Sequence, residues 1–349
     1  MEKSPSITSL SHPSHPHTVL AQACLGVLHR LDEEVKWYNA SDIPLARYAA
    51  RYWVDHARFE DVSSHIRDLA EYFFDVDKPH WAAWHRVYDI DDISWTYFTP
   101  DPVICSVLPF YYAALCGFYD LAKRLIARNP EHVNDMGGRM VTPLVAALSR
   151  NHFRVADLLH QHGADVCVRS KSQTTSLHEA SFAGLVDVVV WLLDHGADVV
   201  TRNARDALPL HMACECGRLE TCRVLLERDA DINGRGRWGV VPLHFAVAPI
   251  FAEDMLEMLQ LLLDRGADLN APDDDGCTPL HDSSWWEEES FDPCHGTVEG
   301  SRLLHDHGAD INAENNEGKT LLGVVLEAGR TKWWFFSQVL VLSEYKSCI

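Results

Sequence analysis

Three cysteines and one histidine lie close together in the middle of the chain: His211, Cys214, Cys216 and Cys222. Thiolate and imidazole are the ligands of structural zinc sites, so this group could in principle hold a metal ion. Cys214 and Cys216, however, are two positions apart and would point to nearly opposite sides of a helix. None of the ten cysteines forms a CxxC pair. We therefore expect no metal here, and reduced, buried thiols in a reducing compartment.

Four histidines recur at intervals of 33, 33 and 37 residues, at His178, His211, His244 and His281. A regular interval distributes side chains along a repeating structure, whereas a catalytic site needs its groups to converge on one point. The chain also contains no Gly-x-Ser-x-Gly, no His-Glu-x-x-His and no glycine-rich dinucleotide fingerprint. The sequence thus predicts that the protein is not an enzyme, with catalysis as a remote alternative.

The triplet Gly318-Lys319-Thr320 matches the end of a phosphate-binding P-loop. That loop needs a second glycine five residues earlier, where Ala313 stands, and it needs a preceding strand and a long following helix. We expect no cofactor. The proline-spaced histidines at positions 12, 15 and 17 could bind a metal loosely, but we interpret residues 1–17 as a solvated tail.

The charge balance is strongly acidic, with 51 acidic and 30 basic residues and a formal net charge of −21. A chain of this charge repels phosphate backbones and anionic lipid, so we expect neither nucleic acid nor membrane as a partner. The N-terminus has no apolar stretch after Lys3, and the apolar run from Trp333 to Leu342 is too short to span a bilayer. We expect a cytoplasmic protein, with the nucleus as the alternative compartment.

The elements that must position these residues follow from a repeat of about 33 residues. One landmark is a tetrad that starts a helix: Thr142-Pro143-Leu144-Val145, Thr175-Ser176-Leu177-His178, Leu208-Pro209-Leu210-His211, Val241-Pro242-Leu243-His244 and Thr278-Pro279-Leu280-His281. A second landmark is the turn Gly-Ala-Asp at Gly163, Gly196, Gly266 and Gly308, with Asp229-Ala230-Asp231 in the remaining slot. Because both landmarks keep one period, the repeat is established without any alignment.

The residue types explain how each unit folds. Threonine caps a short helix, proline fits its first position, and histidine can bond to backbone of the neighbouring unit. Gly184, Gly217 and Asn151 end the first helix because they tolerate left-handed backbone. A second helix follows, and the next Gly-Ala-Asp turns the chain into a hairpin finger. Neither helix can bury its apolar side alone, so the units must stack into an all-α solenoid.

These landmarks resemble those of the ankyrin repeat family over residues 106–346, as about seven repeats. The first, starting near Leu108-Pro109-Phe110-Tyr111, and the last, starting at Thr320-Leu321-Leu322-Gly323, are degenerate. The repeat from Val241 carries extra residues near 249–252, and the repeat from Thr278 carries a Trp-rich insertion around 285–297, either a working loop or neutral drift. The resemblance implies a protein–protein interaction scaffold or adaptor that binds through its fingers and concave face.

The segment 18–100 has a different composition, and we expect an N-terminal helical region there. Thr18–Leu31 is predicted as an amphipathic helix that buries Leu20, Ala23, Cys24, Val27, Leu28 and Leu31, and two more helices are predicted at 43–57 and 61–74. Residues 48–58 and 77–84 resemble the helical linker that precedes the ankyrin repeats of fungal NACHT–ankyrin signalling proteins, although the NACHT module is missing. The alternative function is therefore a truncated regulator of that kind without nucleotide hydrolysis.

The fingers change sign along the chain. The early fingers are basic and the later ones, at 273–275, 314 and 317, are acidic. Charge for solubility is one explanation. Our hypothesis is instead a protein partner with an acidic segment, held by finger and first-helix side chains. The expected partner-binding residues are Arg169, Lys171, Arg202, Arg205, Arg235, Arg237 and Trp238 on the fingers, and Glu179, Phe182, Met212, Glu215 and Phe245 on the first helices.

The last predicted helix, from Trp333 onward, is apolar nearly all round, although the terminal unit of a solenoid should present a polar face to water. It can pack on its own neighbour, or it can be covered by a second copy of the chain or by a continuation of it. The partner hypothesis that follows is self-association of two copies through this helix.

Overall fold

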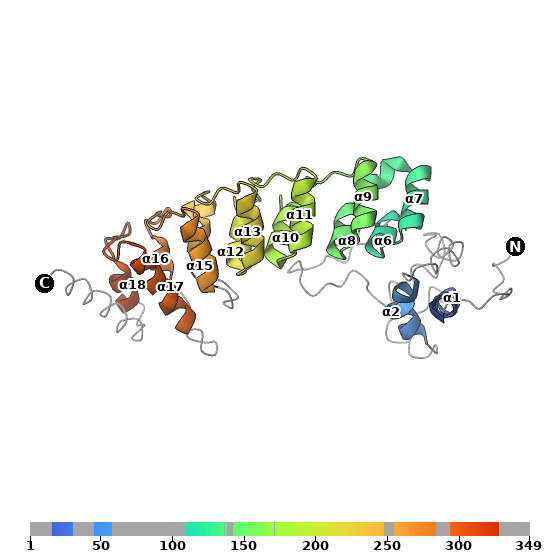
Figure 1. Cartoon of the computed structure of the whole chain (residues 1–349), viewed down its shortest axis with the longest axis horizontal. Coiled ribbons are helices and arrows are strands. Elements are labelled where there is room, and N and C mark those ends of the chain that lie inside the picture. The colour runs from blue at the N-terminus through green and yellow to red at the C-terminus, as the bar shows by residue number, and fades with distance from the viewer. Residues whose placement is uncertain are drawn as a thin grey trace. The chain divides into compact units, whose positions relative to one another are not determined.

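The computed structural model describes residues 16–30, 45–57, 109–135, 137, 142–170, 172–247, 255–283 and 294–327. Within these ranges the regular elements are helices, and one isolated bridge joins Arg169 to Thr175. None of the described helices is both long and apolar enough to cross a bilayer. The predicted all-α fold is confirmed. The chain divides into two compact units, residues 1–165 and 166–349, which are described in turn (Figure 1).

In the described part of the first unit, two N-terminal helices precede two helix pairs. The N-terminal helices are α1 (Pro16–Leu28) and α2 (Ala46–Ala57). The pairs are α6 (Pro109–Leu115) with α7 (Tyr119–Arg128), and α8 (Pro143–Ser149) with α9 (Phe153–Gln161), and a short 3₁₀ helix, η2 (Pro130–Asn134), follows α7. In each pair the two helices contact each other, and α6 also contacts α8. The degenerate first repeat predicted near position 108 is therefore a helix pair of the same kind.

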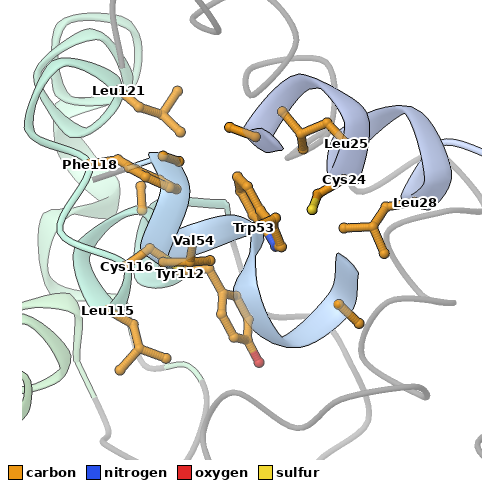
Figure 2. Close-up of a cluster of buried hydrophobic side chains, with 14 of the residues drawn as sticks. Cys24, Leu25, Leu28, Trp53, Val54, Tyr112, Leu115, Cys116, Phe118 and Leu121 are labelled. Atoms are coloured by element: carbon orange, nitrogen blue, oxygen red, sulfur yellow. The ribbon is translucent and has the colours of Figure 1, made fainter. Parts of the chain in front are cut away.

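Trp53 lies at the centre of the core of this unit. Its side chain is fully buried, and its ring centroid is 5.4 Å from that of Phe118. Figure 2 shows Trp53 between Cys24 and Leu28 of α1 on one side and Tyr112 of α6 on the other. Since burying one large apolar side chain is worth roughly 1.5–3 kcal/mol, this cluster ties the N-terminal helices to the first helix pair.

The buried side of α1 agrees with the prediction only in part. Cys24 and Leu28 are buried as expected, but Leu20 and Ala23 are exposed, and Ala21 and Leu25 are fully buried in their place. The helix is apolar nearly all round, so the spacing of apolar residues did not fix which side is covered. Small residues decide it, because Ala21 on α1 and Ala49 and Ala50 on α2 are all buried and allow the two helices to approach closely.

The second unit is built from two layers of helices. The first helices are α10 (Ser176–Ala183), α12 (Pro209–Glu215), α14 (Pro242–Ala246), α16 (Pro279–Asp282) and α18 (Leu321–Glu327). The second helices are α11 (Val186–Asp194), α13 (Leu219–Glu227), α15 (Met255–Asp264) and α17 (Cys294–Asp306). Within each layer successive helices contact each other, and finger loops join one pair to the next along one edge of the unit (Figure 1).

The helix boundaries follow from the predicted capping residues. Thr175 and His178 form a capping box at the start of α10, and Thr278 with His281 repeats it at α16. Gly184 ends α10 in the left-handed conformation, with φ of 76°. This position admits no other residue easily, because a Cβ on Gly184 would collide with the side chain of Arg218.

In the later repeats an asparagine two residues after the turn clamps one repeat to the next. Asn233 donates to the carbonyl of Gly266 at 3.3 Å and accepts from the amide of Asp268 at 2.8 Å. At the equivalent positions of two earlier repeats stand Cys167, whose sulfur lies 3.9 Å from the carbonyl of Gly196, and Val200, which has no polar side-chain atom. The clamp is therefore weakened at the first of these junctions and absent at the second.

Several expectations fall outside the described residues: the third N-terminal helix at 61–74, the aromatic segment up to residue 100, the addition near 249–252, the C-terminal aromatic helix and Lys171. Of the insertion predicted around 285–297, residues 285–293 also fall outside them, and residues 294–297 begin α17. The boundaries 1–17, 18–100 and 106–346 stay predictions.

Candidate protein-binding surface

Backbone hydrogen bonds join the tips of successive fingers in the second unit. The donor and acceptor pairs are Ala204 N–H to Ser172 O at 3.0 Å, Arg237 N–H to Arg205 O at 3.2 Å, Asp274 N–H to Trp238 O at 2.8 Å and Asn316 N–H to Asp275 O at 2.9 Å. The accepting residues are equivalent in their repeats, at intervals of 33, 33 and 37 residues. We call Ser172, Arg205, Trp238 and Asp275 the tip row. Because each tip is bonded to the next, the order of these side chains is fixed.

The tip of the third of these fingers has an unusual backbone. In the neighbouring fingers an Asn or Asp side chain bonds to the turn, as Asn203 does to the amides of Arg205 and Ala207 at 2.8 and 3.1 Å. Gly236 stands at that position in the third finger, and Trp238 there has φ of 60° and ψ of 21°. A bulky residue in this left-handed region carries strain, on the order of 1–3 kcal/mol.

Trp238 is also the most exposed aromatic side chain among the described residues, at 66%. The guanidinium of Arg237 lies over its ring, 4.7 Å from the centroid. A strained and exposed aromatic residue that neighbours hold on both sides is a feature of recognition sites. The structure thus places the predicted aromatic anchor at the surface.

Three of the predicted arginines bond within the chain. Arg169 donates to the carbonyl of Arg202 at 2.9 Å, Arg202 donates to the carbonyl of Arg235, and Arg235 donates to the carbonyl of Pro272 at 2.8 Å. We call Arg169, Arg202 and Arg235 the arginine ladder. Arg235 also pairs with the carboxylate of Asp274 at 3.3 Å. This structural role was not predicted, although the 33-residue spacing of these arginines is its signal in the sequence.

Arg205 and Arg237 are different. Both are exposed, and among the described residues neither has an ion-pair partner. Arg205 instead acts at longer range on Glu215 of α12, where burial raises the pKa of that carboxyl and the positive charge of Arg205 opposes the rise. Of the predicted basic contacts that the structure describes, these two guanidinium groups are the ones still available to a partner.

The first helices present the predicted apolar and acidic side chains at their surface. All five are partly exposed, and we call them the floor: Glu179, Phe182, Met212, Glu215 and Phe245. Burial raises the pKa of Glu179 as well. One further member was missed, since Asp282 is equivalent to Glu179, and burial together with the charge of Asp273 raises its pKa to about 7. The floor therefore offers apolar contact and carboxyl groups that are poorly hydrated.

The repeated histidines hold loops rather than forming a site. His178 bonds through Nε2 to the carbonyl of Ala207 at 3.0 Å, and His211 bonds to that of Val240 at 3.2 Å. Burial lowers the pKa of both to about 4, so both are neutral near pH 7. The expectation that each histidine bonds to the backbone of the neighbouring repeat is confirmed.

The cysteine group does not converge on a ligand position. The sulfurs of Cys214 and Cys222 are 3.7 Å apart in the core, and the hydrogen bond between them and burial raise the pKa of the Cys214 thiol well above its ordinary value. Both ring nitrogens of His211 are used by the backbone, at Leu208 N and Val240 O. In the described part of the chain no three His, Cys, Asp or Glu side chains are grouped as metal ligands.

The P-loop-like triplet occupies the start of a repeat. The ammonium of Lys319 bonds to Glu317 at 2.7 Å and to Glu327, and the carbonyl of Lys319 accepts from His281 at 3.2 Å. The helix that follows, α18, has seven residues. The lysine is committed to carboxylates of its own chain, which is not the setting of a phosphate loop.

The family of ankyrin repeats in three copies matches residues 110–203 and 210–315. The chain belongs to the ankyrin-repeat family. The solved ankyrin repeat domain of Bcl-3, described as a unique member of the IkappaB protein family, is similar at 29% identity and a TM-score of 0.54, over 63% of this chain and 94% of that chain. Ankyrin repeats are typically protein–protein interaction modules, so the fold agrees with the surface described above.

Two relatives match over shorter stretches. The azaphilone pigments biosynthesis cluster protein L of Monascus ruber is 33% identical over 135 residues, 36% of this chain and 28% of that protein. Alpha-latrocrustotoxin-Lt1a of Latrodectus tredecimguttatus is 41% identical over 58 residues, 17% of this chain and 4% of that protein. The matches thus span small parts of both relatives. The resemblance of the N-terminal segment to the NACHT–ankyrin linker stays a prediction.

Proposed function

We propose that this ankyrin protein is an interaction scaffold or adaptor that binds a protein partner through the tip row and the floor of its second unit, and that it works by binding and not by catalysis. The observation that carries the proposal is Trp238, exposed at 66% on a finger whose tip bonds to both neighbouring fingers, through Arg237 N–H to Arg205 O and Asp274 N–H to Trp238 O. Exposed aromatic side chains next to arginine are the usual anchors of protein interfaces.

The floor supports the same surface. Met212 and Phe245 belong to successive repeats and are half-buried. A partner can therefore cover them with little further loss of side-chain conformational entropy. Arg205 acts electrostatically on Glu215 of the floor, and Arg237 lies on the next finger. Exposed charges of this kind steer association and set its salt dependence.

The test compares three baits in an affinity capture from lysate, with captured proteins identified by mass spectrometry. They are the native chain, Arg205→Glu with Arg237→Glu, and a matched control of Arg223→Glu with Arg265→Glu. Arg235 stays native, because reversing its charge would break the ladder contact to Pro272. The control makes the same charge change at α13 and at the end of α15, away from the fingers.

We expect a protein that the native and control baits capture and the finger variant loses. Equal capture by all three would move the binding surface elsewhere in the chain. A protein lost with both variants would indicate a response to net charge alone.

A truncated regulator related to NACHT–ankyrin proteins is the second candidate. It is supported by helix α2, which spans most of the string from Tyr48 that carries the linker resemblance.

A further proposed partner is a second copy of the chain, bound through the helix predicted from Trp333 onward, which lies outside the described residues. Light scattering after size-exclusion chromatography tests it, and a strict monomer at micromolar concentration contradicts it.

A further inference from the structure

The tip row changes chemical character from one finger to the next. Arg205 is basic, Trp238 is aromatic and Asp275 is acidic, and all three are exposed. The bonds between neighbouring tips, at 3.2 Å into Arg205 O and 2.8 Å into Trp238 O, fix this order in space. Trp238 therefore marks the boundary between a positive and a negative stretch of one ridge.

The charges at the two ends of this stretch are available; between them Arg235 and Asp274 cancel, and Arg237 keeps its charge against the Trp238 ring. Arg235 and Asp274 flank the tryptophan finger and pair with each other at 3.3 Å. Among the described residues neither Arg205 nor Asp275 has an ion-pair partner. The tip row itself thus presents a cation at Arg205, an aromatic surface at Trp238 and an anion at Asp275, and the Arg237 guanidinium lies over the aromatic surface.

The spacing of the row suits an extended chain. Helices of neighbouring repeats pack roughly 8–10 Å apart, and an extended segment advances about 3.3 Å per residue. Adjacent members of the row therefore correspond to side chains about three residues apart in such a segment, and Arg205 to Asp275 corresponds to about six.

We propose that the tip row binds an extended segment of a protein partner that carries an acidic, an apolar and a basic side chain in this order, at intervals of about three residues. The acidic group pairs with Arg205, the apolar group packs on Trp238, and the basic group pairs with Asp275. This inference rests on the proposed function and refines it, because a uniformly acidic segment would meet Asp275 at one end. Nucleic acid fits less well for the same reason.

The experiment is a selection of displayed random twelve-residue peptides on the native full-length chain. The enriched peptides are synthesised with a fluorescent label and titrated by anisotropy against the native chain and single variants. The variants are Arg205→Glu, Asp275→Lys and Trp238→Ala, with Met212→Glu for the floor and Arg223→Glu as the control on α13. Circular dichroism checks that each variant keeps its helix content.

We expect enriched peptides to contain an acidic and a basic residue about six positions apart around an apolar one, in either chain direction. Each charge variant should weaken binding about two- to fivefold, and Trp238→Ala about tenfold or more. The sharpest check is complementation. A peptide in which lysine replaces the acidic residue should bind the native chain poorly and should bind Arg205→Glu better.

Enriched peptides of one charge sign, or failure of the complementation while Trp238→Ala still weakens binding, would overturn the bipolar segment and leave the proposed function standing. Peptides that are indifferent to Trp238→Ala and to Met212→Glu would overturn both. A selection that enriches no peptide would also count against both.

Discussion

The carbonyl of Trp238 accepts a hydrogen bond from the amide of Asp274 at 2.8 Å, and this bond joins the last basic finger to the first acidic one. It also holds Trp238 in a left-handed conformation that a bulky residue avoids. Strain that is kept in place by neighbours is usual at recognition sites, where function and stability compete.

Replacing Trp238 by asparagine tests that competition. Asparagine tolerates left-handed backbone, so relief of strain should offset the lost contact with Arg237, which is worth about 0.5–1 kcal/mol at an exposed site. The free energy of unfolding, measured by urea denaturation, should be equal to or above that of the native chain. Trp191 on α11 is buried, and the same replacement there should cost about 3 kcal/mol or more. A loss of similar size at both positions contradicts the strain argument.

The missing asparagine clamp offers a second prediction. Val200→Asn should restore the bonds that Asn233 makes in the next repeat and raise the free energy of unfolding by about 1 kcal/mol. Val200 is 46% exposed, so little burial is lost. The reverse change, Asn233→Val, should lower the free energy of unfolding by a similar amount. Thermal unfolding of both variants is the measurement, and shifts of the same sign would refute the clamp.

The arginine ladder predicts that neighbouring arginines differ in what they do. Arg202→Ala removes bonds to two carbonyl groups and should lower the free energy of unfolding by about 1 kcal/mol. Arg205→Ala removes no contact of that kind and should change stability by less than about 0.5 kcal/mol. Guanidinium denaturation of the two variants decides this. Equal effects would mean that the ladder does not support the fingers.

Most of the fold could be predicted from the sequence because the two landmarks report backbone conformation directly. Proline at a helix start, glycine with positive φ after a first helix and histidine within bonding reach of the next loop are local requirements. The buried side of α1 could not be fully predicted, because an all-round apolar helix does not determine which of its sides packs against the neighbouring helix α2. The site was predicted in part. Arg202 and Arg205 are both arginines of the same loop. Only the conformation of each side chain decides that Arg202 bonds to the neighbouring finger and that Arg205 is left for a partner.

The buried histidines predict a pH dependence with a definite sign. The pKa of His211 is lowered from 6.5 to about 4 by burial, so between these values the unfolded chain binds a proton that the folded chain does not. The stability that neutral His211 provides is complete above pH 6.5 and is lost as the pH falls toward 4. In urea denaturation, the advantage of the native chain over His211→Gln should therefore shrink over this range. An advantage that stays constant with pH contradicts the burial argument.

The most direct test of the central claim is hydrogen–deuterium exchange of the full chain with and without the protein that the native bait captures. The account predicts slower exchange on binding at the finger tips around Arg205 and Arg237–Val240 and at the ends of α10 and α12, with α13 and α15 unchanged. Protection confined to the second helices, or to the N-terminal helices α1 and α2, would contradict binding through the tip row and the floor.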